Sequence, residues 1–359
     1  MATIQKYTTS KGATRWRVRW TEDGKRKSET FSTWKLAHGR KVDIEHSIND
    51  GSYVQKSAVT ISAYLDTWIV SQTQLAPNTA RGYKDCIAHV KPLIGHRDIQ
   101  SVTAVDIESM YKKLSVSLSG TTVLYVHRVL RRALKQAERQ RILNRNPCDF
   151  VDAPKKNSEK KASLIPRAEI ALYLKTFEGH VLYPAVRLAL SCGLRRGEVL
   201  GLEWRDIDWK QKQITISRQM TYDGPGDTKS HKKRTIPISD GMVEFLKSQR
   251  EKQKKNMEIR WNRYNKSDYV VTFDDGRLIN LRYLSDEFKE VLRRSKMPVV
   301  RFHDLRHTAG SVMIMEGVDL KTVSDILGHS SIKITADIYG HIEDEHKRDA
   351  VSRIDKFML

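Results

Sequence analysis

The stretch His303-Asp304-Leu305-Arg306-His307-Thr308 is the most informative segment of this chain of 359 residues. We expect a helix over residues 303–316, on which His303 and Arg306, three positions apart, share one face. A guanidinium keeps its charge and offers paired donors to a phosphate. The pattern His-x-x-Arg alone is a common surface accident, so its meaning depends on the motifs elsewhere in the chain.

The segments on both sides of this stretch carry four further motifs. In chain order they are Gly193-Leu194-Arg195-Arg196-Gly197-Glu198, Thr228-Lys229-Ser230, Leu327-Gly328-His329-Ser330-Ser331 and Tyr339-Gly340-His341. Together the motifs provide two arginines, a lysine, two histidines and a tyrosine. These are the groups needed to cut a phosphodiester through a covalent tyrosyl phosphate. The five motifs, in this order, resemble those of the tyrosine recombinase (phage integrase) family.

The resemblance implies a catalytic set, which consists of Arg195, Lys229, His303, Arg306, His329 and Tyr339. Tyr339 would be the nucleophile, and the two arginines would neutralise the non-bridging oxygens of the phosphate. Lys229 would protonate the leaving 5′-hydroxyl, although further cations at 232–234 crowd the same loop. His329 would donate a hydrogen bond to the scissile phosphate.

Several neighbours of these motifs are interpreted as supporting residues. We expect Glu198 in a structural ion pair, and Arg196 at the surface or in a secondary phosphate contact. His307 and His341 are assigned structural roles, and Cys192 stands where the family usually has threonine. The resemblance implies a reaction without metal, ATP or other cofactor. The sequence agrees, because it shows no acidic cluster at metal-ligand spacing.

The composition indicates a polyanionic partner. The chain has 64 Lys+Arg against 43 Asp+Glu, a net charge of +21, and each phosphate that a cation neutralises releases counterions. The family resemblance makes double-stranded DNA the expected partner. Three widely spaced cysteines argue against a disulfide framework or a structural zinc, and favour a reducing cytosol. No run approaches the roughly 18 apolar residues of a membrane span. With the resemblance to phage integrases, the expected location is the bacterial host cytoplasm, with the nucleoid.

Residues 1–57 are expected to form a small strand-rich module. Three arginines (Arg15, Arg17 and Arg19) alternate with Trp16, Val18 and Trp20, so a strand would carry basic groups on one face and apolar groups on the other. The module resembles the arm-type DNA-binding domain of some integrases, and a sheet of this kind fits a major groove. The alternative is an ordinary amphipathic hairpin with a solvated face.

The remaining chain divides by pattern into a helical region, a linker and a mixed region. Residues 58–151 have helical spacing and resemble a core-binding domain, with DNA-contact candidates Arg128, Arg131 and Arg132; the alternative is a solvated helix face. Residues 152–164 are predicted as a basic linker. Residues 165–359 are predicted as a mainly α-helical α+β catalytic domain, with β-type runs on both sides of a Gly/Pro turn at 223–226. The segment 342–359 would dock on a neighbouring protomer or on its own domain.

The expected fold class is thus multidomain: a small β-sheet-plus-helix module, an all-α domain and a mixed catalytic domain. The expected function is site-specific DNA recombination, integrating or excising a phage or other mobile element. The family implies a homotetramer on core-type and arm-type sites, a Holliday junction, and DNA-bending or directionality factors as further candidate partners. The alternatives are a type IB topoisomerase, which would relax DNA that lacks any specific site, and a non-catalytic DNA-binding regulator, which would form no covalent adduct.

Overall fold

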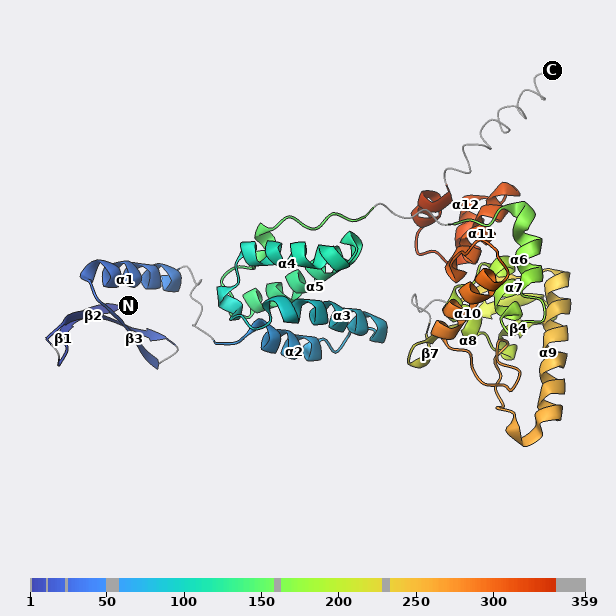
Figure 1. Ribbon diagram of the computed structural model, residues 1–359, viewed down its shortest axis with the longest axis horizontal. Helices are drawn as coiled ribbons and strands as arrows, with labels where there is room; N and C mark the ends of the chain where they lie inside the picture. The colour runs from blue at the N-terminus through green and yellow to red at the C-terminus, as the bar shows by residue number, and fades with distance from the viewer. Residues whose placement is uncertain are drawn as a thin grey trace, which may run out of the picture. The chain divides into compact units, whose positions relative to one another are not determined.

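The computed structural model describes residues 2–10, 12–22, 25–49, 58–157, 163–227 and 233–339. It divides into two compact units, Met1–Glu159 and Lys160–Leu359, which are described separately (Figure 1). Lys229, His341 and the segment 342–359 lie outside the described residues. Within the described parts, no helix has the length and apolar character needed to span a membrane.

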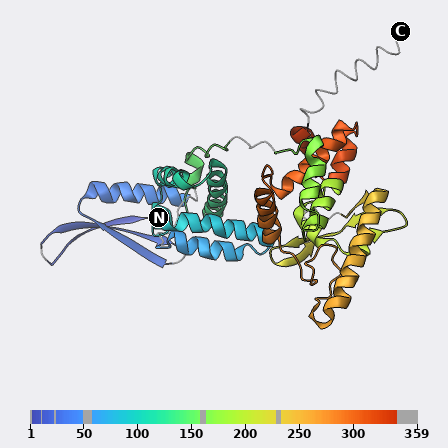
Figure 2. The same ribbon diagram turned by 45° about the vertical axis from the view of Figure 1, so that its right-hand side comes forward.

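The chain begins with an antiparallel sheet of order β1-β2-β3, covered on one face by a helix (Figures 1 and 2). The elements are β1 (Thr3–Thr8), β2 (Thr14–Glu22), β3 (Lys25–Phe31) and α1 (Trp34–Asn49). Val18 and Trp20 of β2 are buried in one cluster with Ala37 and Ile44 of α1. The predicted alternation is confirmed: Arg17 pairs in register with Gln5 and Thr30, on the face that α1 leaves open.

The described residues from 58 to 150 form a helical bundle. Its elements are α2 (Ile61–Ser71), α3 (Pro77–Ile94), η1 (Ile99–Ser101), α4 (Ala104–Ser117), α5 (Gly120–Arg139) and η2 (Pro147–Phe150). The helix starts have local causes, because Thr60, Thr103 and Ser119 each accept a hydrogen bond from a backbone N–H of the first turn. Helix α5 is central, burying an apolar stripe that includes Val126 and Leu130. Residues 152–157 have no regular secondary structure.

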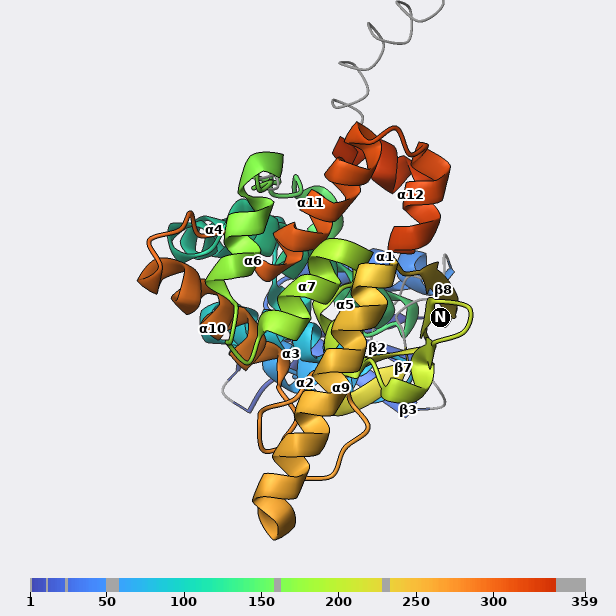
Figure 3. The ribbon, with the colours of Figure 1, turned by 90° about the vertical axis from the view of Figure 1, so that its right-hand side faces the viewer.

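The second unit combines helices with two small sheets (Figures 1 and 3). In order, its elements are η3 (Arg167–Glu169), α6 (Ile170–Thr176), α7 (Tyr183–Cys192), α8 (Arg196–Gly201), η4 (Trp204–Asp206), β4 (Ile207–Asp208), β5 (Gln213–Ile216), β6 (Arg218–Thr221), β7 (Gly224–Asp227), β8 (Arg234–Pro237), α9 (Asp240–Arg260), η5 (Trp261–Arg263), α10 (Leu281–Arg294), α11 (Phe302–Met315) and α12 (Leu320–Leu327). Residues 332–339 are also helical. Helices α7, α10 and α11 share one apolar core, in which Leu188, Phe288 and Leu305 are fully buried.

The prediction of a Gly/Pro turn at 223–226 is wrong for its last three residues. Gly224–Asp227 forms strand β7, which pairs antiparallel with β6, and the chain reverses at 222–223. Gly224 adopts a φ of +113°, which glycine accepts at low cost. Pro225 fits because a strand with one partner leaves a row of backbone groups unpaired, where its missing N–H is no loss. The other sheet has order β4-β5-β8, so β8 returns beside β5.

Candidate active site

Arg195 is presented by the turn between α7 and α8. Gly193 ends α7 in the left-handed region, with φ +62°, and a Cβ on it would collide with the side chain of Leu327. The turn therefore requires glycine both for its backbone angle and for its contact with α12. Arg195 follows as the extended N-cap of α8, and its side chain remains 38% exposed. The turn thus leaves this guanidinium accessible to a ligand.

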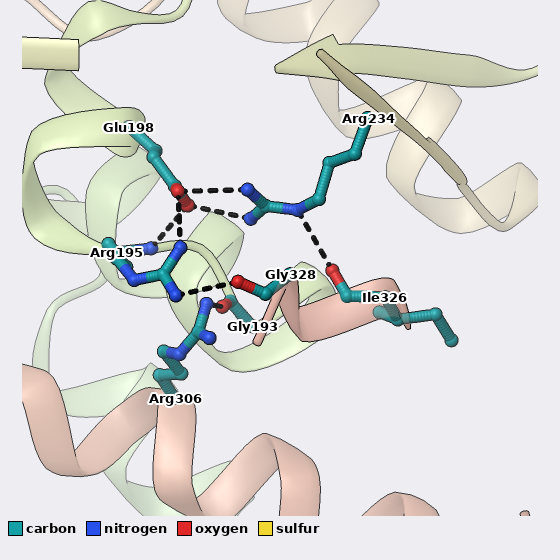
Figure 4. A network of polar contacts seen from close by, with 7 residues as sticks. All are labelled: Gly193, Arg195, Glu198, Arg234, Arg306, Ile326 and Gly328. Carbon is teal, nitrogen blue, oxygen red and sulfur yellow. Dashed lines mark hydrogen bonds and ion pairs between the residues drawn. The ribbon is translucent and has the colours of Figure 1, made fainter. Parts of the chain in front are cut away.

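A buried carboxylate holds Arg195 in place (Figure 4). Glu198 is 2% exposed; its Oε1 accepts from Arg195 Nη1 at 2.8 Å, and its Oε2 accepts from the Arg195 backbone N–H at 2.9 Å. Arg234 of β8 donates to the same carboxylate through Nη1 and Nη2, at 2.9 and 2.7 Å. Burial acts to raise the pKa of Glu198, but the interactions with Arg234 and Arg195 outweigh it and lower the pKa to about 2. The carboxylate is therefore ionised at any ordinary pH.

The two motif arginines are each anchored on a carbonyl that belongs to another motif. Arg195 Nη2 donates to the carbonyl of Gly328 at 2.8 Å, and Arg306 Nη1 donates to the carbonyl of Gly193 at 2.8 Å (Figure 4). Three segments that are distant in the sequence, around 193–198, 306 and 328, are thereby fixed to one another. The arrangement brings two guanidinium groups close to each other, and a pair of this kind can bind two oxygens of one phosphate.

Arg306 is a buried cation with spare hydrogen-bonding capacity. It is 2% exposed on α11, and its Nη2 has no hydrogen-bond partner among the described residues. Burial, and then the charge of Arg195, lower the pKa of Arg306 to about 9, which still leaves it charged at neutral pH. Leaving a buried donor unpaired costs about 1–3 kcal/mol, and more for a charged group. Such a group is a strong candidate for binding an anion.

His303 and His329 lie near the arginines in their neutral form. His303 is exposed, yet partial burial of its ring and the neighbouring His307 and Arg306 lower its pKa to about 4. Burial and the charges of Arg306 and Arg195 lower the pKa of His329 to about 4. Nδ1 of His329 lies 2.8 Å from Oγ1 of Thr335. A neutral imidazole carries one N–H, so each histidine has a donor available at neutral pH.

Tyr339 is fully buried in this structure. It packs in a cluster with Ile314, Val323 and Leu327, and its hydroxyl oxygen lies 3.4 Å from Nδ1 of His307. Burial raises the pKa of Tyr339 to about 12, although the charge of Arg306 opposes the rise. The phenol is therefore beside the cationic cluster, protonated and covered. It has to leave this packing before it can reach a substrate.

The structure brings together Arg195, His303, Arg306, His329 and Tyr339, while Lys229 lies outside the described residues. Sequence analysis missed the role of Arg234, which it treated only as one of several cations in a crowded loop. It also assigned His307 a purely structural role, whereas His307 is next to the Tyr339 hydroxyl. The described residues contain no group of three or more His, Cys, Asp or Glu side chains arranged to hold a metal ion.

The first unit carries the basic surfaces that the sequence singles out. Arg17 lies over the ring of Tyr7 at 4.5 Å on the open face of the sheet, between the exposed Arg15 and Arg19. On α5, three exposed arginines line a groove of about 480 Å³ together with Lys135 and Arg139; they are Arg128, Arg131 and Arg132. These groups are partly engaged, because Arg131 donates to Asp149 at 2.7 Å and Arg132 to the Tyr83 hydroxyl at 2.9 Å.

Comparison with known proteins gives consistent matches. The model of the phage integrase family matches residues 164–346. A tyrosine recombinase XerC-like protein of Caldanaerobacter subterraneus is 29% identical over 94% of both chains, and the ICEBs1 integrase of Bacillus subtilis is 28% identical over 91% of both. Among solved structures, the Tn1549 transposon integrase in complex with a circular intermediate DNA is similar over 82% of this chain and 99% of its own, with TM-score 0.69 and 20% identity. The lambda integrase tetramer bound to a Holliday junction is similar over 93% of this chain and 94% of its own, with TM-score 0.63 and 17% identity.

Proposed function

The chain belongs to the phage integrase family and is a site-specific tyrosine recombinase, and from this premise we propose that Tyr339 attacks the scissile phosphate of DNA. The phenolic oxygen forms a bond to phosphorus, the bond from phosphorus to the 5′ oxygen breaks, and the 5′-hydroxyl leaves with a proton. The 3′-phosphotyrosine conserves the energy of the broken bond. A 5′-hydroxyl from a partner strand then reseals the backbone without ATP.

Arg195 and Arg306 bind the non-bridging oxygens of the phosphate in this mechanism. The observation that carries the proposal is the crossed anchoring of these arginines on Gly328 and Gly193, which points two fixed cations to one place beside Tyr339. Donors fixed before the reaction stabilise developing charge without reorganising, and removal of one typically lowers the rate by about 10²–10³-fold. The unpaired Nη2 of Arg306 supports the same role, since a phosphate oxygen would complete its hydrogen bonding.

The histidines and Lys229 complete the proposed site. His303 and His329, neutral at the pH of the cell, donate hydrogen bonds to the phosphate. The assignment of Lys229 as the general acid for the 5′-hydroxyl is supported by the motif resemblance alone, because Lys229 lies outside the described residues. A lysine protonates the leaving oxygen most effectively when nearby cations lower its pKa.

The test of this function is covalent trapping on a nicked suicide substrate. The chain should form a protein–DNA complex that survives a denaturing gel, and Tyr339→Phe should bind the same DNA without forming it. Tyr222→Phe is the matched control and should trap DNA normally, because Tyr222 is 51% exposed in the reversal between β6 and β7 and its hydroxyl accepts a hydrogen bond from Arg196 rather than from Arg195 or Arg306. A denaturation-resistant adduct on the Tyr339→Phe variant would refute the assignment.

The first unit supplies DNA binding in this proposal. Residues 1–57 bind arm-type sites through the open face of the sheet, residues 58–151 bind core-type DNA through α5, residues 152–164 connect them, and residues 165–359 perform the chemistry. The relatives solved with a Holliday junction or a circular DNA intermediate motivate assembly of a homotetramer on double-stranded DNA. Integration or excision of a phage or other mobile element, in the host nucleoid and with DNA-bending or directionality factors, is the proposed biological role. The comparisons do not favour the topoisomerase and regulator alternatives.

A further inference from the structure

We propose that Arg234 is a positioning residue for the recombination reaction, acting through Glu198 on Arg195. The inference rests on the proposed role of Arg195 in binding the scissile phosphate. Arg234 begins β8, five residues after Lys229 in the sequence, and it is absent from the set of residues that the motifs predict. Its contacts connect that strand to the motif that ends at Glu198 and to Gly328 in the motif that begins at Leu327.

The contacts of Arg234 show that it serves other side chains rather than DNA. Both terminal nitrogens are bonded to the carboxylate of Glu198, and Nε donates to the carbonyl of Ile326 at 3.1 Å (Figure 4). The side chain is only 15% exposed. A guanidinium held by a bidentate pair and a third bond presents a fixed geometry. Arg234 is therefore occupied by the protein, whereas Arg195 is 38% exposed and has room for a ligand.

The shared carboxylate makes the position of Arg195 depend on Arg234. Each oxygen of Glu198 accepts from Arg234 and also from the side chain or backbone of Arg195. If Arg234 were neutral, Arg195 would remain as the one cation hydrogen-bonded to the buried carboxylate among the residues that the structure describes. The stronger pair would draw the Arg195 guanidinium toward Glu198 and away from the phosphate. Arg234 thus prevents Glu198 from competing with the substrate for Arg195.

A second contact extends this effect to the segment before His329. The donation from Nε to the Ile326 carbonyl pins the last turn of α12, and a Cβ on Gly328 would lie 2.8 Å from Cδ of Arg234. Gly328 has φ +65° and supplies the carbonyl that anchors Arg195. Arg234 therefore fixes Arg195 from two sides, through Glu198 and through the backbone of Gly328. A displacement of about 1 Å in such a site lowers a rate by about 10²-fold.

The experiment compares single-turnover cleavage by the full chain on a nicked substrate. Arg234→Met should cleave about 10- to 100-fold more slowly than the unchanged chain, with DNA binding nearly unaffected. Glu198→Gln in the Arg234→Met chain removes the competing charge and should restore part of the rate. Arg234→Lys, which cannot make the bidentate pair, should be intermediate. Arg218→Met is the control, because Arg218 also pairs with two carboxylates, Glu203 and Asp206, outside this network; it should retain cleavage.

A substrate with a methylphosphonate at the scissile position separates positioning from folding. This neutral group replaces one charged oxygen, so it reduces the need for Arg195. It should raise the cleavage rates of both Arg195→Ala and Arg234→Met relative to that of the unchanged chain. On the ordinary substrate, the double variant should cleave only slightly more slowly than Arg195→Ala. Three outcomes would overturn the role of Arg234 and leave the proposed function intact. They are rescue of Arg195→Ala without rescue of Arg234→Met, additive losses of cleavage in the double variant, and normal cleavage by Arg234→Met. Normal cleavage by Arg195→Ala would refute the proposed function as well.

Discussion

The hydroxyl oxygen of Tyr339 lies 3.4 Å from Nδ1 of His307, and the tyrosine side chain is completely buried. Its ring lies against Gly310 of α11, where a Cβ would come within 2.5 Å of the hydroxyl oxygen. The proposed nucleophile therefore occupies a slot that exists only because residue 310 has no side chain. In the proposed reaction Tyr339 leaves this slot before it attacks the phosphate, and several consequences of the site can be measured directly.

Gly310→Ala should destabilise the second unit by about 1–3 kcal/mol, because the added methyl group overpacks the slot of Tyr339. Denaturant unfolding followed by a probe in the second unit measures this change. Gly241→Ala in α9 is the control: no atom lies within 4 Å of its added Cβ, and alanine in a helix is about 1 kcal/mol more favourable than glycine. Equal stability of the two variants would show that Tyr339 does not occupy this slot.

Arg306→Met should lower activity with little change in stability. The guanidinium is buried with an unpaired Nη2, so removing this costly charge offsets the loss of the Nη1 bond to the Gly193 carbonyl, and the melting temperature should change little. Cleavage should fall by about 10²–10³-fold because one phosphate-binding donor group is removed. In Arg218→Met, by contrast, the largely buried Asp206 carboxylate loses its arginine and Glu203 keeps its pair with Arg205, so this variant should lower stability by about 3 kcal/mol while cleavage persists. Strong destabilisation by Arg306→Met would indicate a structural residue instead.

Stability of the second unit should fall as the pH drops from about 6.5 toward 4. Burial lowers the pKa of His329 to about 4, so in this window the unfolded imidazole binds a proton that the folded one does not. The sign is therefore a loss of stability with acid. Urea unfolding at several pH values should give a shallower loss for His329→Gln, and the same loss as the unchanged chain for His96→Gln, an exposed residue of the first unit. An identical slope for all three proteins would contradict the assignment.

The open face of the N-terminal sheet should account for binding to a second DNA site. Replacing Arg15, Arg17 and Arg19 together by alanine should weaken that binding and reduce the slope of log K against log salt by about 2.7, at about 0.9 for each phosphate that is no longer neutralised. Core cleavage should remain. The control removes three cations from α1, on the covered side of the sheet, and changes the net charge equally: Lys35, Arg40 and Lys41 to alanine. Equal effects of the two triple variants would mean that charge, and not this face, determines binding.

The sequence predicts the helices well because their apolar spacing is a local property. The helix expected at 303–316 corresponds to α11, and the alternation of arginines in β2 correctly assigns its two faces. The sequence does not predict strand β7, because the Gly-Pro-Gly segment is typical of a turn. It is a strand because it pairs with β6, and that pairing is not a local property of the sequence.

The site is predicted in its residue types but not in its contacts. The motifs identify the arginines, histidines and tyrosine, because the chemistry needs those groups. The ion pair between Arg234 and Glu198 joins residues 36 positions apart in the sequence, so no local sequence pattern predicts it. The burial of Tyr339 against Gly310 depends on the packing of two helical segments, so its sequence motif carries no sign of the covered state.

The central claim is that one tyrosine becomes covalently attached to DNA, and peptide mapping of the trapped complex tests it most directly. The complex on a nicked suicide substrate would be digested with nuclease and protease, and the nucleotide-bearing peptide identified by mass spectrometry. The account predicts a single modified residue, Tyr339, linked through its phenolic oxygen to a 3′-phosphate. A 5′-phosphate linkage, or attachment to any other residue such as Tyr222 or Tyr264, would contradict it.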